Sequence, residues 1–363
     1  MGLKCRRLVT EDSPRMPSNQ VVARAADAEQ HPPELVCPAG SLAALKAAVD
    51  AGADCVYTGY RDDTNARNFA GLNFTAAELE QGMRYAHARG VRVFVAVNTY
   101  PQTESFDRWC AAIDRAAASG ADAVIVADAG LMEYTAATHP ELCLHLSVQG
   151  SATTHQAINF YRRLFGVRRA VLPRVLTLDQ VAKLMGKAET EIEVFGFGSL
   201  CVMVEGRCAL SSYVTGQSPN TAGACSPAWA VQWQSTPKGL ESRLNGVLID
   251  RYADGEKAAY PTLCKGRYSV DGETYYAIEE PTSLNTLELL PDLLRLGVAG
   301  IKLEGRQRSP AYVTEVTRVW RAAIDACFDE PSRFAVRGDW MRRLGTLAEG
   351  QQHTLGAYIR HWR

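Results

Sequence analysis

From Glu34 onward, the sequence repeats one unit: a short apolar run, a turn and a segment with helical periodicity. The apolar runs are continuous rather than alternating, as expected of parallel strands that are buried on both faces. We predict eight strands, over 34–40, 54–59, 92–98, 123–128, 144–150, 168–175, 191–198 and 299–305. Helices are expected over 42–52, 75–88 and 310–327. This pattern predicts an α/β fold of the closed (β/α)8 TIM-like type, a parallel barrel.

An open doubly wound sheet is the alternative architecture. It is disfavoured because no glycine-rich dinucleotide fingerprint follows the first apolar run. The repeat stops after the seventh run, and residues 199–298 form an insert, which in a compact domain usually has a function. Within the insert, Asp271-Gly272 between β-prone flanks predicts a hairpin. The predicted organisation is a flexible tail over 1–33, the barrel with its insert over 34–330, and a C-terminal extension packed on the barrel over 331–363.

Charge and hydropathy exclude several classes of protein. The chain has 39 basic and 40 acidic residues, so no global field attracts RNA or an anionic membrane, and no nucleic-acid partner is expected. No apolar run reaches the roughly 18 residues that a membrane span requires, and the N-terminus lacks the apolar segment of a secretory signal. We therefore expect a cytoplasmic protein. Structural disulfides are rare there, so clustered members of its ten cysteines must be weighed as metal ligands.

Polar residues mark the carboxyl ends of the predicted strands, where parallel barrels place their active sites. The strand-end residues are Pro38, Tyr57, Asn98, Asp128, Gln149, Arg174, Cys201 and Glu304. A capped loop or a packed barrel end is the alternative reading for each of them. The loop 61–71 adds further polar groups that could position a substrate. Of the seven histidines only His145 falls in a predicted strand, so histidine-based nucleophilic catalysis is not expected.

The stretch "LEGRQRS" concentrates charge at the end of the last strand. It places Glu304 at the strand end, with Arg306 and Arg308 just beyond, and Arg174 faces the same opening if the barrel holds. Arginine offers planar, bidentate recognition of carboxylates. Glu304 could exchange a proton with a substrate or simply pair with one of these arginines. We predict Glu304, Arg306 and Arg174 as the catalytic residues.

Four cysteines lie at the start of the insert and within it: Cys201, Cys208, Cys225 and Cys264. Four thiolates suit zinc or an iron–sulfur cluster, since both prefer soft sulfur ligands. The spacing C-x6-C-x16-C-x38-C matches neither a zinc ribbon nor a ferredoxin run, so buried free thiols remain the alternative. Arg207, Lys265 and Arg267 flank two of the thiols, and positive charge favours the thiolate form that binds metal.

Longer stretches carry a resemblance to a known family: "ELVCPAGSLAALKAAVDAGADCVYTG", "FGFGSLCVMVEGRCALSSYVTG", "GACSPAW", "YPTLCKGRY" and "IKLEGRQRSPAYV". The chain resembles the collagenase-like peptidase family, in its iron–sulfur hydroxylase branch, from about Glu34 to the C-terminus. The resemblance implies a 4Fe-4S cluster held by Cys201, Cys208, Cys225 and Cys264.

The resemblance also implies an activity and partners. The activity is oxygen-independent hydroxylation of the aromatic ring of ubiquinone precursors, with prephenate as the oxygen donor. The partners are a UbiV-like protein, in a heterodimer, and a lipid-binding accessory protein of the pathway. Trp229 and Trp233, beside Cys225, could anchor the partner or pack over the cluster.

Alternative functions come from the same family. Some relatives hydroxylate tRNA or ribosomal RNA, so an RNA hydroxylase is the first alternative. A peptidase, as the family name suggests, or a zinc-stabilised binding module is the next. The peptidase reading lacks a recognisable nucleophile–base pair or an H-E-x-x-H metal motif.

Overall fold

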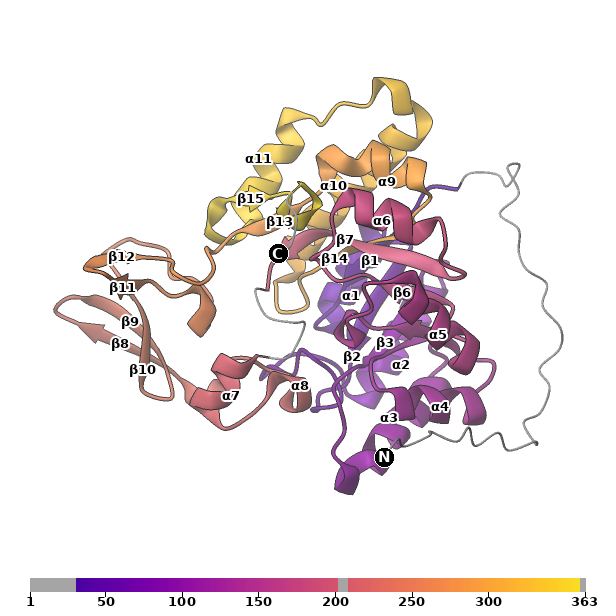
Figure 1. Ribbon diagram of the computed structural model, residues 1–363, viewed down its shortest axis with the longest axis horizontal. Coiled ribbons are helices and arrows are strands. Elements are labelled where there is room, and N and C mark those ends of the chain that lie inside the picture. The colour runs from indigo at the N-terminus through magenta and orange to yellow at the C-terminus, as the bar shows by residue number, and fades with distance from the viewer. Residues whose placement is uncertain (1–30, 202–207, 360–363) are drawn as a thin grey trace, which may run out of the picture. The chain divides into compact units, whose positions relative to one another are not determined.

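The computed structural model describes residues 31–201 and 208–359. Eight parallel strands close into a barrel: β1 (Glu34–Pro38), β2 (Cys55–Gly59), β3 (Arg92–Val97), β4 (Ala123–Val126), β5 (Cys143–Leu146), β6 (Arg169–Val171), β7 (Glu191–Ser199) and β14 (Gly300–Leu303). β1 to β7 pair in chain order, and β14 closes the ring by pairing in parallel with both β7 and β1 (Figure 1). The prediction of a (β/α)8 TIM-like barrel is confirmed.

Helices follow the barrel strands, and most begin at a capping side chain. They are α1 (Leu42–Asp50), α2 (Ala76–His87), α3 (Phe106–Ala118), α4 (Ala129–Thr138), α5 (His155–Phe165), α6 (Leu178–Met185), α9 (Leu290–Leu296) and α10 (Pro310–Asp329). Thr75 and Glu78 form a reciprocal capping box at the start of α2, which satisfies two backbone donors that the first turn leaves free. The helices expected over 42–52, 75–88 and 310–327 are all formed, with ends shifted by two residues or fewer.

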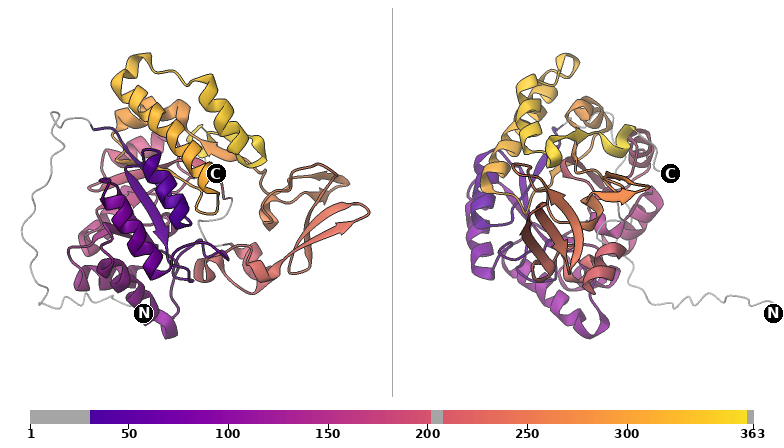
Figure 2. Two further views of the ribbon diagram at one scale, coloured as in Figure 1. Left: turned by 180° about the vertical axis from the view of Figure 1, so that it is seen from behind. Right: turned by 90° about the vertical axis from the view of Figure 1, so that its left-hand side faces the viewer.

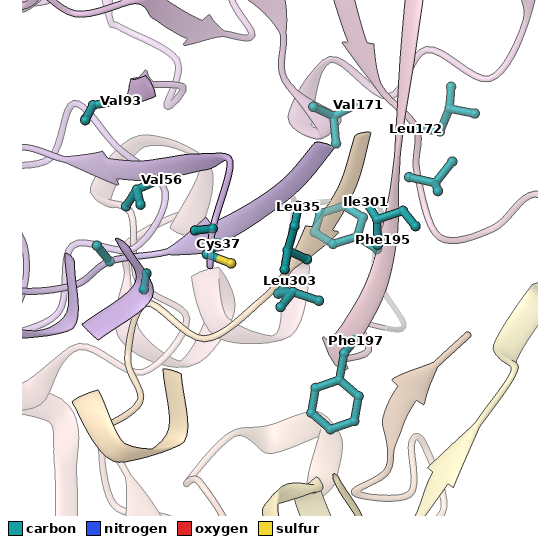
Figure 3. Close-up of a cluster of buried hydrophobic side chains, with 14 of the residues drawn as sticks. Leu35, Cys37, Val56, Val93, Val171, Leu172, Phe195, Phe197, Ile301 and Leu303 are labelled. Carbon is teal, nitrogen blue, oxygen red and sulfur yellow. The ribbon is translucent and has the colours of Figure 1, made fainter. Parts of the chain in front are cut away.

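The main hydrophobic core lies between the strands and the surrounding helices. Leu35 of β1 and Ile301 of β14 are register partners in adjacent strands, and both side chains are fully buried (Figure 3). Trp320 of α10 is also fully buried in this core. Alternate residues of the same strands point into the barrel, where Val36, Tyr57 and Phe94 belong to a smaller cluster. Each strand is thus buried on both faces, as its continuous apolar run predicts.

The barrel interior also holds charged side chains that the apolar runs did not reveal. Arg169, which is 2% exposed, pairs with Glu34 at 2.8 Å, Glu191 at 2.6 Å and Glu193 at 3.4 Å. Lys302 reaches the other oxygen of Glu193 at 2.8 Å. Burial lowers the pKa of the nearby His145 to about 3, so its ring is neutral at pH 7. Paired charges of this kind avoid the cost of an isolated buried ion.

Between β7 and β14 the chain leaves the barrel and builds two small sheets. A three-stranded antiparallel sheet contains β8 (Val231–Thr236), β9 (Gly239–Leu244) and β10 (Val247–Tyr252), and a hairpin contains β11 (Tyr268–Val270) and β12 (Glu273–Tyr275). Both stand apart from the barrel strands (Figure 2). Asp271 and Gly272 adopt positive φ angles of 53° and 86° at the hairpin turn, which confirms the predicted hairpin. Two short helices, α7 (Ala209–Thr215) and α8 (Pro219–Ala222), precede these sheets.

The C-terminal segment returns to the barrel sheet. β13 (Ser283–Asn285) pairs antiparallel with β7, and β15 (His353–Thr354) pairs parallel with β13 after helix α11 (Gly338–Leu347). The tail expected over 1–33 falls outside the described residues except for its last three positions. Among the helices of residues 31–201 and 208–359, none has the length and apolarity needed to cross a bilayer.

Candidate functional site

The four cysteines of the insert come from separate segments and line one cavity. Cys201 follows β7, and Cys208 caps the N-terminus of α7, where its sulfur accepts a hydrogen bond from the Ser211 N–H at 3.4 Å. Cys225 follows α8, and Cys264 lies in the 3-10 turn Leu263–Lys265. Cys208, Cys225 and Cys264 carry free thiols. The convergence of the four cysteines on a single cavity is the feature that sequence spacing alone could not establish.

The electrostatics of these thiols differ from the expectation. Burial raises the pKa of Cys264 to about 11, and burial also raises the pKa of Cys225, although the Arg67 guanidinium acts in the opposite direction. Arg267 does not stabilise the thiolate of Cys264, because its guanidinium pairs with Asp250 at 2.8 Å and with Glu256 at 2.9 Å. The expectation for Arg267 is therefore wrong. Lys265 lines the cavity and pairs with Glu349, and its charge lowers the pKa of Cys264 as expected, although burial outweighs it. Arg207 lies outside the described residues.

The donor set of this cavity fits a thiolate-bound metal group in its chemistry. Four cysteines line it, and soft sulfur is what zinc and iron–sulfur clusters prefer. Within 31–201 and 208–359, no three side chains of His, Cys, Asp or Glu stand close enough together to hold a metal ion as they are.

A second cavity opens at the carboxyl ends of the barrel strands. Its polar lining comes from β2, from β14 and from the loops that follow the strands: Tyr57, Arg67, Asn98, Ser147, Gln149, Arg174, Lys302, Glu304 and Arg306. We call this second cavity the barrel cavity and the first one the cysteine cavity. Five residues line both of them: Ala66, Arg67, Gln149, Arg174 and Glu304. The two cavities therefore share a wall.

Glu304 forms ion pairs with two arginines of the shared wall. Its two carboxylate oxygens accept from Arg67 at 2.6 Å and from Arg174 at 3.1 Å. Burial alone would raise the pKa of Glu304, but the two guanidinium groups outweigh it and hold the pKa at about 2. The carboxylate is thus ionised at neutral pH, and ion pairing is the role that the geometry gives it. Gly198, with φ of 136°, makes room for it, because a Cβ there would lie 2.4 Å from the Glu304 Cβ.

Arg306 is a buried cation with spare hydrogen-bonding capacity. It is 6% exposed, and its Nη1 donates to the Asn65 Oδ1 at 3.0 Å. No carboxylate of the described residues lies within ion-pair distance of it. Burial lowers the pKa of Arg306 to about 10, so the group remains charged at pH 7. A guanidinium has five N–H donors, so most remain available to a ligand in the barrel cavity.

Two of the predicted strand-end residues, and Arg308 beyond the last strand, lie elsewhere. Asp128 caps α4 by accepting from the Leu131 N–H at 3.0 Å, which is the capped-loop alternative. Pro38 lines neither cavity. Arg308 donates to the Leu347 carbonyl at 2.9 Å and also lines neither cavity.

Sequence reasoning missed several lining residues or placed them imprecisely. β5 ends at Leu146 and β6 at Val171, so Gln149 and Arg174 stand in loops beyond the strands. Arg67 is one of several polar residues in the loop 61–71, and nothing in the sequence singles it out. Lys302 sits inside an apolar run, which hides it. Phe69 and Tyr260 also line the cysteine cavity, with ring centroids 5.7 Å apart in edge-to-face geometry.

The two tryptophans near Cys225 do not shield the cysteine cavity. Trp229 is 58% exposed and Trp233 is 45% exposed, and neither lines the cavity. The prediction that the two tryptophans pack over the cysteines is therefore wrong for the described residues. An interface role stays a prediction.

Comparisons with known proteins place these features in a family. The family described as Peptidase family U32 matches residues 40–360. An uncharacterized protease of Methanocaldococcus jannaschii is 34% identical, over 82% of this chain and 66% of its own length. The tRNA hydroxylation protein P1 of Bacillus subtilis is 30% identical over 87% and 68%, and a collagenase of Porphyromonas gingivalis is 30% identical over 86% and 70%.

The chain spans about two thirds of the length of these curated relatives, 66% in the first case. Among solved structures, the U32 peptidase Mk0906 is similar over 50% of this chain and 75% of its own, with a TM-score of 0.41 and 16% identity.

Proposed function

The chain belongs to peptidase family U32, and within it we propose an iron–sulfur subunit of an oxygen-independent hydroxylase that acts on the aromatic ring of a ubiquinone precursor. The observation that carries the proposal is that four cysteines line a cavity which shares a wall with the barrel mouth. The stretches "DDTNARNFAGLNFT" and "EEPTSLNTLELLP" resemble the ubiquinone-biosynthesis member UbiU, and this likeness supports the choice of substrate.

The cluster would be held by Cys201, Cys208, Cys225 and Cys264. When bound, a 4Fe-4S group would supply electron transfer at the edge of the barrel mouth. Arg67, whose guanidinium favours the thiolate of Cys225, joins this side of the site to Glu304. The Arg67–Glu304–Arg174 ion pairs would then fix the position of the cysteine cavity relative to the barrel cavity.

The substrate side of the proposal rests on two features. Phe69 and Tyr260 give the cysteine cavity an aromatic wall, against which a ring can pack. Arg306 offers a buried guanidinium to the barrel cavity and would bind a carboxylate of the oxygen donor, for which we propose prephenate. In this proposal Arg306 binds the donor, while Glu304 and Arg174 position the wall.

RNA hydroxylation is the second candidate function. It is favoured by the relatives, since proteins of Bacillus subtilis and Escherichia coli that are 30% identical are named tRNA hydroxylation proteins. The formal charge of −1 argues against it, because RNA binding draws its affinity mainly from phosphate neutralisation. A peptidase is less well supported, because no histidine lines either cavity within the described residues.

The proposal is tested in two steps. Protein purified without oxygen should contain about four iron and four sulfide per chain, with broad visible absorption. A strain lacking the gene should lose ubiquinone during anoxic growth and keep normal hydroxyuridine in its tRNA, as measured by mass spectrometry. Zinc in place of iron would overturn the cofactor. Loss of hydroxyuridine with normal ubiquinone would establish the second candidate instead.

A further inference from the structure

Gln149 presents an unused hydrogen-bond acceptor to both cavities. It lies in the 3-10 turn Val148–Gly150 beyond β5, is 4% exposed, and lines the cysteine cavity and the barrel cavity. Its backbone is engaged: its N–H donates to the Ser147 Oγ at 3.2 Å and its carbonyl accepts from the Tyr100 hydroxyl at 3.0 Å. Its side-chain Oε1 is buried and has no hydrogen-bond partner among the residues that the structure describes.

The polar neighbours of Gln149 in the barrel cavity are already paired. Asn98 donates to the Ser147 Oγ at 3.0 Å, and its own oxygen accepts from the Ala66 N–H at 3.0 Å. Lys302 is paired with Glu193. Glu304 is paired with Arg67 and Arg174. A buried amide oxygen without a partner is costly, so the vacant position at Gln149 points to a ligand that donates a hydrogen bond.

Arg306 provides the complementary group from another part of the barrel mouth. It follows β14, whereas Gln149 follows β5, and β6 and β7 lie between these strands around the ring. The barrel cavity therefore carries an unpaired acceptor and a cation with spare donors on separated parts of its wall.

We infer that the barrel cavity binds a small hydroxy acid, with its carboxylate on Arg306 and its hydroxyl donating to the Oε1 of Gln149. Only the role of this ligand as oxygen donor rests on the proposed function. Gln149 then acts as a specificity-determining residue, because a site built around a hydroxyl rejects the analogue that lacks it. Its place on the shared wall would direct that hydroxyl toward the cysteine side.

Gln307 is the rival position and the matched control. Its Oε1 is also buried and lacks a partner within 31–201 and 208–359, but Gln307 lines only the cysteine cavity. If a hydroxy acid bound among the cysteines instead, Gln307 would recognise its hydroxyl.

Calorimetric titration of the full chain at pH 7 with 4-hydroxybenzoate and with benzoate tests the inference. The wild type should prefer the hydroxy acid by about tenfold or more, since a lost hydrogen bond to a buried partner has this size. Gln149→Met should bring the preference close to one while benzoate still binds. Gln307→Met should keep the preference, and Arg306→Ala should abolish binding of both acids.

Several outcomes would overturn the inference. They are equal affinity of the wild type for both acids, no binding of either acid, or loss of the preference in Gln307→Met alone. These failures are separable from failure of the proposed function. Protein without iron that still prefers the hydroxy acid would contradict only the hydroxylase. Iron-loaded protein that supports quinone synthesis but shows no preference would contradict only the hydroxy-acid site.

Discussion

At the scale of single residues, Arg306 is the side chain on which the proposed donor site depends. Changing Arg306→Ala should leave iron content and partner binding intact but lower anoxic ubiquinone at least about tenfold, since a charge-assisted hydrogen bond contributes about 1.5–3 kcal/mol. Arg306→Lys should restore little, because an ammonium cannot reproduce the planar fork. Quinone extracted from complemented strains gives the measurement.

Arg308→Ala is the matched control for this experiment. Arg308 lies two residues further on and hydrogen-bonds the Leu347 carbonyl away from both cavities. That variant should produce normal quinone. Normal quinone in the Arg306→Ala strain would show that the barrel mouth does not hold the donor.

The ionised carboxylate of Glu304 contributes to the free energy of unfolding. Its pKa of about 2 lies below the value of about 4.3 expected when unfolded. The stabilisation is therefore fully present above the unfolded pKa and is lost as the pH falls through about 2. Glu304→Gln should lower the free energy of unfolding by about 3–5 kcal/mol at pH 7, and this difference should shrink steadily below about pH 5.

Urea unfolding at pH 7, 4 and 3 measures that difference. Glu80→Gln serves as control, because the Glu80–Arg84 pair is exposed and 4.0 Å apart, and its removal should change little at any pH. A difference between wild type and Glu304→Gln that does not vary with pH would contradict the ion-pair role.

At this residue scale the sequence indicates which groups face the mouth but not how they pair. Glu304, Arg306 and Arg174 could be predicted to line it because barrel strand ends are recognisable. The pairing of Arg67 with Glu304 joins residues 237 positions apart and depends on how a loop folds over the mouth. The unpaired oxygen of Gln149 likewise becomes visible only when its surroundings are known.

At the scale of elements, the end of β7 sets the position of the shared wall. Gly198→Ala would place a Cβ 2.4 Å from the Glu304 Cβ at a φ of 136°. We expect the free energy of unfolding to fall by more than the roughly 1–2 kcal/mol that a positive φ alone costs an alanine. Gly90→Ala, with φ of 72° and nothing within 4 Å, isolates that backbone cost and is the control. Equal losses in the two variants would show that the wall tolerates displacement.

The four cysteine-bearing segments should act as one unit in metal binding. Changing Cys201, Cys208, Cys225 or Cys264 to Ala should each remove most iron and labile sulfide. Cys55→Ala and Cys143→Ala are controls, because neither residue lines the cysteine cavity, and both should keep iron. Iron and sulfide assays on anaerobic protein give the result. Full iron content in Cys208→Ala would refute the ligand assignment.

Element prediction succeeds where the determinants are local. The barrel strands follow from continuous apolar runs, and the hairpin follows from the Asp271-Gly272 turn. The interior ion pairs of Arg169 and Lys302 cannot be predicted in this way, because one or two charges hardly interrupt an apolar run. The sequence also could not predict that the four cysteines line one cavity. A three-stranded sheet separates Cys264 from Cys225 in the chain, and the fold of this sheet brings Cys264 to the cavity.

At the scale of the whole molecule, apolar side chains are exposed on the segment between β7 and β14. Trp229, Trp233 and Tyr213 are 58%, 45% and 92% exposed, and Val247 and Ile278 are 44% and 42% exposed. Large exposed aromatic residues are typical anchors of protein interfaces. These residues lie on the same segment of the chain as Cys208, Cys225 and Cys264.

We therefore predict that co-expression with a UbiV-like protein gives a stable one-to-one complex through these exposed side chains. The double variant Trp229→Ala/Trp233→Ala should raise the dissociation constant at least about thirtyfold, as loss of a hot spot of about 2 kcal/mol or more implies. Phe160→Ala/Leu164→Ala is the matched control, since these α5 residues are 48% and 59% exposed and lie far from the insert in sequence. Size-exclusion chromatography with light scattering measures the complex. Separate elution of both iron-loaded proteins as monomers would contradict the heterodimer, and equal weakening by the α5 variant would place its interface elsewhere.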